Sequence, residues 1–215
     1  MFRTEILKYL SADSEVLDLG AGAGIVEQMN FKGLVRKICG VDLDPRVEEN
    51  PYLDEGRKAS ANQIPYPDRS FDLVFSDNVL EHLEHPELVF QEVFRVLKPG
   101  GVFLAKTPNK YHYMPLIARL TPHWFHQWVN KLRGRASVDT FPTLYRANCR
   151  RDFMSLSGKA GFEVKAVLLH EGRPEYLRIF TPAYLIGYLY QRIVQSFDFL
   201  SQFRVVMVGI VCKPI

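Results

Sequence analysis

The sequence predicts an α/β fold built around a mostly parallel sheet, and three observations carry that prediction. A short apolar run over 16–19 is followed by glycines at every second position, Gly20, Gly22 and Gly24. A second apolar run ends in Asp42, roughly 20 residues beyond the glycines, the spacing with which nucleotide-binding α/β folds place a carboxylate on ribose hydroxyls. Further short apolar runs then alternate with helical patterns along the rest of the chain.

The glycine-rich stretch is the expected cofactor site. Glycine lets the backbone turn sharply and leaves a ligand room to lie against the main chain. Residues 25–28 are expected to open a helix whose N-terminal amides point at that ligand. With Asp42 at the end of a strand expected over 35–41, the arrangement indicates a site for a cofactor that contains adenosine.

The spacing of the glycines separates two classes of cofactor. The dinucleotide fingerprint is G-x-G-x-x-G, whereas this chain has G-x-G-x-G over 20–24, led by Asp18 inside the strand. That form resembles motif I of the class I S-adenosylmethionine-dependent methyltransferases. Residues 71–83 resemble the family's fourth strand with the turn after it, and residues 92–101 resemble its next helix and the start of strand five. Several ordered motifs at family spacing are more specific than any one of them.

The resemblance extends over about residues 15–109, with a looser tail from Tyr145, and is to the small-molecule type of this family that includes the ubiquinone and menaquinone biosynthesis enzymes. It implies a Rossmann-like, doubly wound, seven-stranded, mostly parallel sheet, with an antiparallel last strand between strands five and six and a helical insertion after strand five. It implies S-adenosyl-L-methionine as cofactor and methyl transfer as activity. The cofactor-binding residues carried over by position are Asp18, Gly20, Ala21, Gly22, Gly24, Asp42, Leu43, Ala61, Asn62, Asp77 and Asn78. Ser60 stands where the family often has an acid, which leaves backbone groups to contact adenine.

The remaining elements are expected from periodicity and from helix-breaking residues. In the first half these are an amphipathic helix over 2–10 with Phe2, Ile6, Tyr9 and Leu10 on one side, a short helix capped by Asp44-Pro45 and ended by Asn50-Pro51, and strands over 56–61 and 71–75. In the second half, a helix is expected from Pro86 with a core-facing stripe of Val89, Val93, Val96 and Leu97. Two further helices are expected, over 150–159 and over 176–199, the latter broken at Thr181-Pro182. Strands are expected to start over 102–105 and to cover 162–169 and 203–212.

The segment Tyr111–Thr143 is the least typical part of the chain. It contains both tryptophans, Trp124 and Trp128, and lies where this fold commonly inserts substrate-recognition structure. One interpretation is a helical hairpin whose aromatic side chains pack on the sheet edge. The favoured one is a lid or substrate pocket, because ligand sites combine apolar walls with a few polar groups. With no linker or repeat, residues 1–215 are expected to form one domain with this insertion at 111–143.

Candidate catalytic residues are Glu81, His82 and His112. Methyl transfer requires the nucleophile to be held about 3–3.5 Å from the methyl carbon, and a base only if the nucleophile carries a proton. His82 follows strand four and His112 follows strand five, so either could be a general base that Asp77 or Glu81 orients. Asp77, Glu81 and His82 could instead gather around magnesium, although no metal site is assigned. Glu81 and His82 could also simply cap and pack a short helix, which is the more common arrangement.

Composition restricts the acceptor and the compartment. The net charge of +3 is too small to indicate nucleic acid, and no long basic stripe is present. A lipid-like, quinone-like or secondary-metabolite acceptor fits the aromatic segment better. Three cysteines without close spacing indicate reduced thiols, the first residues do not open a signal peptide, and the longest apolar run, 205–212, is too short to span a membrane. A cytoplasmic protein is therefore expected.

Two questions stay open at this level. Trp124, Phe125 and Trp128 lie near Arg119, Lys131, Arg133 and Arg135, and 184–190 is a second apolar stretch. Burial of both is favoured, and weak peripheral contact with an anionic bilayer is the alternative. The alternatives to an active methyltransferase are an inactive cofactor-binding interaction protein and, less favoured, a nicotinamide-dependent oxidoreductase, which would need the pyrophosphate pattern and a Tyr-x-x-x-Lys pair that the chain lacks.

Overall fold

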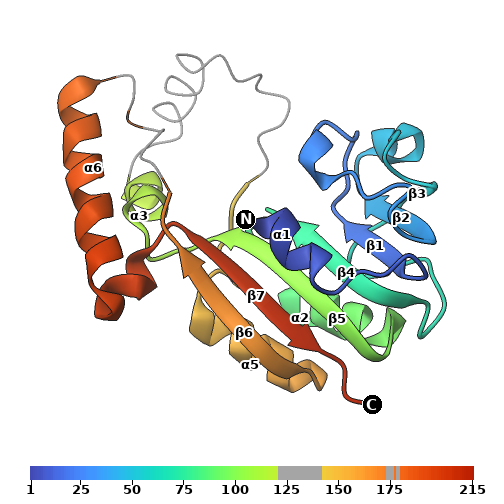
Figure 1. Cartoon of the computed structure of the whole chain (residues 1–215). Coiled ribbons are helices and arrows are strands. Elements are labelled where there is room, and N and C mark those ends of the chain that lie inside the picture. Colours follow the sequence, from blue (N-terminus) through green and yellow to red (C-terminus); the bar gives the residue numbers. More distant parts are fainter. Residues whose placement is uncertain (121–141, 173–176, 178–179) are drawn as a thin grey trace.

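A seven-stranded sheet with the order β3-β2-β1-β4-β5-β7-β6 forms the centre of the protein. It is seen in a computed structural model that describes residues 1–120, 142–172, 177 and 180–215 (Figure 1). The first five strands pair in parallel, and β7 enters antiparallel between β5 and β6. The strands are β1 (Glu15–Leu19), β2 (Lys37–Asp42), β3 (Glu55–Lys58), β4 (Phe71–Asp77), β5 (Leu97–Pro108), β6 (Glu163–His170) and β7 (Val206–Cys212). The predicted fold class is confirmed.

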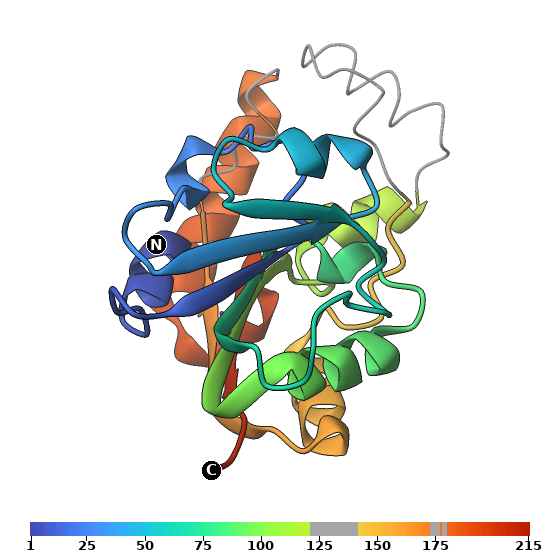
Figure 2. The ribbon, with the colours of Figure 1, turned by 90° about the vertical axis from the view of Figure 1, so that its right-hand side faces the viewer.

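Helices cover both faces of the sheet. The α-helices are α1 (Phe2–Leu7), α2 (Pro86–Val96), α3 (Tyr113–Leu120), α5 (Arg150–Ala160) and α6 (Thr181–Ser196). Short 3₁₀ turns are η1 (Glu27–Met29), η2 (Pro45–Glu49), η3 (Leu80–His82) and η6 (Asp198–Phe203). Helix α1 lies on one face of the sheet, whereas α2 and α5 lie side by side on the other (Figures 1 and 2).

The core is divided by the sheet into two clusters. Leu17 and Leu19 of β1 pack with Phe90 of α2 and Phe153 of α5. Val16, which points to the opposite face, belongs to the cluster that contains Phe2, Ile6 and Phe31. Successive side chains of a strand point to opposite faces, and a parallel strand buried on both faces therefore needs apolar residues at successive positions.

The prediction of a helix starting at residue 25 is wrong. Only the single turn η1 follows the glycines, and Ile25 and Val26 are exposed. The side chain of Asn30 accepts a hydrogen bond from the Lys32 N–H at 3.0 Å, and Gly33 has a left-handed φ of 80°. These residues turn the chain back so that Phe31 is buried, which leaves no length for a helix before β2.

Several element boundaries also differ from the prediction, among them β3, which ends at Lys58, and β7, which begins at Val206. Helix α1 ends at Leu7, so Tyr9 is exposed rather than on the buried side. Strand β5 begins at Leu97 instead of after Gly101, because Leu97 pairs with Phe71 before a register shift in β4. Helix α6 begins at Thr181, since proline lacks the N–H that a helix interior needs and is tolerated in the first turn.

The predicted insertion is described only in part. Helix α3 covers residues 113–120, and the chain is described again from residue 142. The lid interpretation, and the expectations for Trp124, Phe125, Trp128, Lys131, Arg133 and Arg135, fall in 121–141 and so lie outside the described residues, as does the side chain of Arg119.

Candidate cofactor site

The glycine loop connects the end of β1 to the end of β2. The Gly20 N–H donates to the Val41 carbonyl at 2.8 Å, which aligns the loop with the neighbouring strand. Gly24 has a φ of 71°, and a Cβ there would overlap the Oδ1 of Asn50. A left-handed backbone without room for a Cβ requires glycine. The protein's own packing therefore explains Gly24 without a ligand.

Gly22 differs from Gly24 because the space that a Cβ would occupy is open. It has a φ of 51°, and the nearest atom to a Cβ at this position would be Asp42 Oδ2, at 3.9 Å. Its N–H donates to the same Oδ2 at 2.9 Å. The space above Gly22 is thus kept free by the backbone and not filled by the protein, as a ligand lying against the main chain requires.

Asp42 holds the loop in place. Its Oδ2 accepts from Gly22 and its Oδ1 accepts from the Asp44 N–H at 2.8 Å. Each carboxylate oxygen can accept more than one hydrogen bond, so these contacts leave capacity for ribose hydroxyls. Leu43, the next residue, is largely exposed.

Asn50, which the sequence predicts only as the end of a short helix, also contacts the glycine loop. Its Nδ2 donates to the carbonyls of Ala21 and Gly22, each at 3.1 Å, and its Oδ1 accepts from the Tyr52 N–H at 2.9 Å. The side chain is buried. Its two Nδ2 contacts fix the backbone at Ala21 and Gly22, so Asn50 helps to set the shape of the loop. No sequence signal beyond Asn50-Pro51 pointed to this contact.

A cavity of about 350 Å³ lies beside the loop, within the range of small-molecule sites. Seven of the eleven predicted cofactor residues line it: Asp18, Gly20, Ala21, Gly22, Gly24, Asp77 and Asn78. Residues that sequence reasoning missed also line it: Ala23, Ile25, Val26, Met29, Asn50, Tyr52, Leu53, Phe75 and Lys106. Asp42, Leu43, Ala61 and Asn62 do not; Ala61 packs against the core and Asn62 is exposed beyond β3.

Carboxylates dominate the charge of the cavity. Burial, followed by the charges of Asp77 and Asp42, raises the pKa of Asp18 well above its usual range. Asp77 Oδ1 lies 2.5 Å from the Nζ of Lys106. Lys106 therefore faces two acidic groups in the cavity, Asp18 and Asp77, and a bound cationic group would favour the ionised form of Asp18. The ammonium and sulfonium groups of S-adenosylmethionine have this charge, so the residues present fit that cofactor.

Asn78 shapes the mouth of the cavity. It has a φ of 58°, uncommon for a residue other than glycine, and its N–H donates to the Lys106 carbonyl at 2.9 Å. The turn carries the chain away from β4 at its carboxyl end. Ligands of open α/β sheets bind at this edge.

Glu81 and His82 lie together beyond this turn and do not line the cavity. Glu81 is buried, and its Oε2 accepts from the Thr107 hydroxyl at 3.0 Å. Burial raises the pKa of Glu81. His82 Nδ1 lies 2.8 Å from the Pro142 carbonyl, and its Nε2 lies 4.0 Å from Glu81 Oε1. The Glu81 carbonyl also accepts from Leu144, so this pair ties η3 to the chain that follows residue 141.

His112 lies in a different cluster. It is buried, its Nε2 is 3.8 Å from Glu171 Oε1, and its ring contacts Tyr113 and Tyr190. Burial lowers the pKa of His112 to about 4 and raises the pKa of Glu171 to about 7. No residue of this cluster lines the cavity beside the glycine loop. The structure brings His82 and Glu81 together, and it places His112 apart from them.

The described part of the chain contains neither a metal-binding cluster nor a membrane-spanning helix. Within 1–120, 142–172, 177 and 180–215, no group of three histidine, cysteine, aspartate or glutamate side chains is arranged to hold a metal ion. No helix formed by these residues is both long enough and apolar enough to cross a bilayer.

Known proteins resemble the chain in sequence and in fold. Residues 17–105 match the family model of a methyltransferase domain. A protein of Mycolicibacterium smegmatis described as a probable S-adenosylmethionine-dependent methyltransferase is 34% identical over 51% of this chain and 44% of its own length. The ubiquinone biosynthesis O-methyltransferase of Maricaulis maris is 27% identical over 68% of this chain and 61% of its own length. Neither alignment reaches two thirds of the relative.

The fold extends beyond the matched motifs. The crystal structure of a SAM-dependent methyltransferase from Methanosarcina mazei superposes with a TM-score of 0.62, covering 98% of this chain and 97% of that one at 18% identity. At this identity the likeness is one of fold. The fold is thus shared over nearly the whole chain.

Proposed function

We propose that this chain is a class I S-adenosylmethionine-dependent methyltransferase and that it transfers a methyl group from S-adenosyl-L-methionine to a small-molecule acceptor, as the matched methyltransferase domain and the M. smegmatis relative support. The observation that carries the proposal is the open space over Gly22 beside the acidic cavity. We propose that residues 1–215 work as one domain, with the segment 111–143 contributing to acceptor binding. Three buried free thiols, Cys39, Cys149 and Cys212, support a reducing cytoplasmic location.

The chain's own residues have separable roles in this proposal. When bound, the cofactor supplies an electrophilic methyl group on a sulfonium. Asp42 binds the ribose hydroxyls while holding the Gly22 N–H. Asp18 and Asp77 balance the positive charge of the methionine end, and Asn50 keeps the loop open. Positioning of this kind supplies most of what an in-line displacement needs.

The proposed acceptor is lipid-like, quinone-like or a secondary metabolite. One relative is named for O-methylation in ubiquinone biosynthesis, which supports an aromatic hydroxyl as the accepting group. The described surface also includes apolar residues at the cavity mouth, Ile25 and Val26, both exposed. An apolar rim around a polar centre suits an acceptor with a hydrocarbon part.

A hydroxyl acceptor must lose its proton, and His82 is the better candidate base. It is partly exposed, whereas His112 is buried with a pKa of about 4 and is protonated only in acid. Glu81 lies beside His82 and would stabilise an imidazolium. His112 remains the second candidate base until turnover of the two alanine variants has been compared.

Calorimetry followed by turnover tests the proposal. The chain should bind S-adenosylmethionine and not NAD, and it should then form S-adenosylhomocysteine with catechol or hydroquinone acceptors that carry alkyl chains. Binding without turnover on any acceptor class would favour an inactive cofactor-binding interaction protein. Binding of NAD with no affinity for S-adenosylmethionine would favour the oxidoreductase and contradict the assignment.

A further inference from the structure

Helix α6 presents apolar side chains on two opposite faces. Gly187 and Val194 are buried on its inner side. On the outer side Leu185, Ile186, Leu189 and Ile193 are exposed to 60%, 71%, 60% and 43%. Residues spaced by three or four positions form one stripe of a helix, and a stripe of this composition is normally buried. The outer stripe is therefore an apolar surface that the described fold does not cover.

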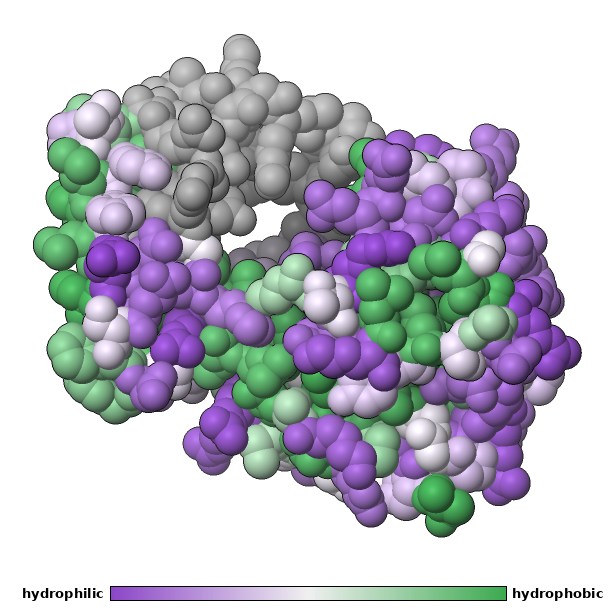
Figure 3. Space-filling model, in the orientation of Figure 1, coloured by the Kyte–Doolittle hydropathy of each residue, from purple (hydrophilic) through white to green (hydrophobic). Residues whose placement is uncertain are grey.

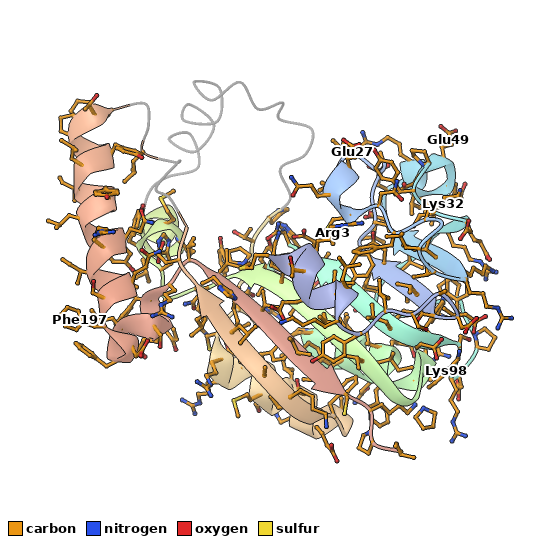
Figure 4. All side chains as sticks on the ribbon, in the orientation of Figure 1. Arg3, Glu27, Lys32, Glu49, Lys98 and Phe197 are labelled. Atoms are coloured by element: carbon orange, nitrogen blue, oxygen red, sulfur yellow. The ribbon has the colours of Figure 1, made fainter. Side chains whose placement is uncertain are left out.

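The outer stripe continues past the end of the helix. Phe197 and Phe199 follow directly, and Phe199 is 74% exposed. Helix α6 stands at the β6 end of the sheet (Figure 1), apolar side chains follow this outer edge (Figure 3), and Phe197 lies at its foot (Figure 4). Large contiguous apolar patches on a protein surface mark sites of association.

Three arginines lie beside the patch. Arg150 and Arg151, at the start of α5, line a cavity of about 760 Å³ together with Met154 and Phe199. Both arginines are exposed, as is Arg192 on α6. Among the residues that the structure describes, the guanidinium groups of Arg150, Arg151 and Arg192 form no ion pair.

The acidic groups near the patch differ in their surroundings. Asp152 pairs with Lys110. Asp198, an exposed residue at the start of η6, lines the same cavity as Arg150 and Arg151 and lies 3.3 Å from the guanidinium of Arg204. Glu171 is buried against His112. The surface around the apolar stripe thus has excess positive charge.

We propose that α6 and η6 form a membrane-binding face that rests on an anionic bilayer, with Arg150, Arg151 and Arg192 at the level of the headgroups. A helix of 16 residues is about 24 Å long and can lie in the interface with its apolar side among the acyl chains. Anionic headgroups then neutralise the arginines. The sequence favoured burial of 184–190, and the exposure of Leu185, Ile186 and Leu189 reverses that preference.

A second copy of the chain would complement this surface less well than an anionic bilayer. A symmetric dimer brings the same patch of both subunits together. Burying the stripe in this way would place the three arginines of each copy around one shared interface, where Asp198, already 3.3 Å from Arg204, is the exposed acid that the structure describes beside them. An anionic bilayer covers the apolar residues and supplies the missing negative charge.

Cosedimentation with vesicles tests the proposal on the full chain. Binding to vesicles of phosphatidylcholine and phosphatidylglycerol in equal parts should exceed binding to phosphatidylcholine alone and should weaken with salt. Leu185→Gln combined with Leu189→Gln should lower partitioning at least about tenfold. Leu88→Gln, at a comparably exposed leucine on α2, should not change it. Arg150→Gln combined with Arg151→Gln should lower it about fivefold or more on the mixed vesicles only.

Site-specific labelling provides a second readout. The three native cysteines are buried, so an environment-sensitive thiol probe should react selectively with an introduced Leu189→Cys or, as the matched control, Leu88→Cys. Mixed vesicles should shift the emission of the probe at residue 189 to the blue and leave the probe at residue 88 unchanged.

Three outcomes would overturn the proposal. The first is no vesicle binding at low salt. The second is equal binding by the Leu185→Gln/Leu189→Gln variant with an intact circular dichroism spectrum. The third is a dimer in light scattering that this variant dissociates, which would assign the face to a second copy. Vesicle binding needs neither cofactor nor acceptor, so its failure would leave the proposed methyl transfer untouched.

Discussion

Acidic side chains lie at two places along the same edge of the sheet, and the surroundings of the two places differ. Asp18 and Asp77 lie beside the glycine loop, line an open cavity and have Lys106 as a neighbour. Glu171 follows β6, is closed off from solvent and faces the neutral ring of His112. Both groups contain an acid whose pKa is raised by burial.

The difference indicates which acidic group is prepared for a ligand. A buried carboxylate that opens to a cavity can regain its favourable charged state when a cation binds. A carboxylate sealed against a neutral histidine has no such route, and its burial affects stability rather than binding. We therefore propose that the glycine-loop group is the binding site, whereas the Glu171 group belongs to the pH-sensitive packing around α6.

The largest expected effect separates the two histidines. His82→Ala should lower turnover at saturating cofactor by about 10²–10⁴-fold if the acceptor is a hydroxyl, as loss of a general base does. His112→Ala, in the sealed cluster, should lower turnover much less and should instead reduce thermal stability. Steady-state kinetics with calorimetric affinity as control measures this. The opposite ranking would move the reacting centre towards α6, and two unaffected variants would indicate catalysis by positioning alone.

Gly22→Val should remove cofactor binding while the protein stays folded. The added side chain meets no protein atom closer than Asp42 Oδ2, so its main effects are to fill the ligand space and to strain a left-handed backbone. Gly33→Val is the matched control, because Gly33 has a φ of 80° with open space around it. We expect an affinity loss of at least about 100-fold for Gly22→Val only. Equal losses in both would mean that strain, not occupied space, is responsible.

Glu171→Gln should change the pH dependence of stability. The pKa of Glu171 is about 7 in the folded protein, against an ordinary value of 4.5. The folded state holds this proton more tightly, so the stability it contributes is present below pH 4.5 and is lost as the pH rises to 7. His112 acts in the opposite direction, because its pKa of about 4 lies below the ordinary 6.5 and stability falls as the pH drops between these values.

The glutamine variant keeps the volume of Glu171 but does not titrate. Denaturant unfolding should show that it gains about 1–3 kcal/mol relative to the wild type on going from pH 5 to pH 8. Asp198→Asn, at an exposed acid of the same region, serves as the control. An unchanged difference between the two pH values would show that Glu171 is not held protonated.

The smallest expected effect concerns Asn50. Asn50→Ala removes the donor to the Ala21 and Gly22 carbonyls and should cost about 1–2 kcal/mol of stability. Cofactor affinity should fall by a smaller factor than for Gly22→Val, because the ligand space remains. Thermal unfolding with and without cofactor measures both effects, and an unchanged loop in this variant would reduce Asn50 to a helix terminator.

The parts of the site that could be predicted are those with local signals. Glycines at every second position and Asp42 at the end of a strand each follow from spacing along the chain. Asn50 and Lys106 could not be found this way, because η2 and β5 bring them to the loop across long stretches of sequence. The prediction of a helix after Gly24 is wrong because the effect of Asn30 and Gly33 depends on the chain turning back over Phe31.

The outer face of α6 shows a different limit. Its leucines and isoleucines have the spacing of a buried helix face, and sequence periodicity does not distinguish a core partner from a partner outside the chain. Only the position of α6 at the end of the sheet shows that nothing in the described fold covers this side. Fold class was therefore predictable from local patterns, whereas exposure had to come from the three-dimensional packing.

Calorimetric titration of the wild type and of Asp42→Ala with S-adenosylmethionine, and with NAD as the comparison ligand, tests the central claim most directly. Asp42 fixes the Gly22 N–H and lies at the end of β2, and loss of charge-assisted contacts with the ribose should weaken binding at least about tenfold. We expect the wild type to bind S-adenosylmethionine and not NAD, and Asp42→Ala to show this loss while keeping its fold. Equal affinity of the two proteins for S-adenosylmethionine, or a preference for NAD, would contradict it.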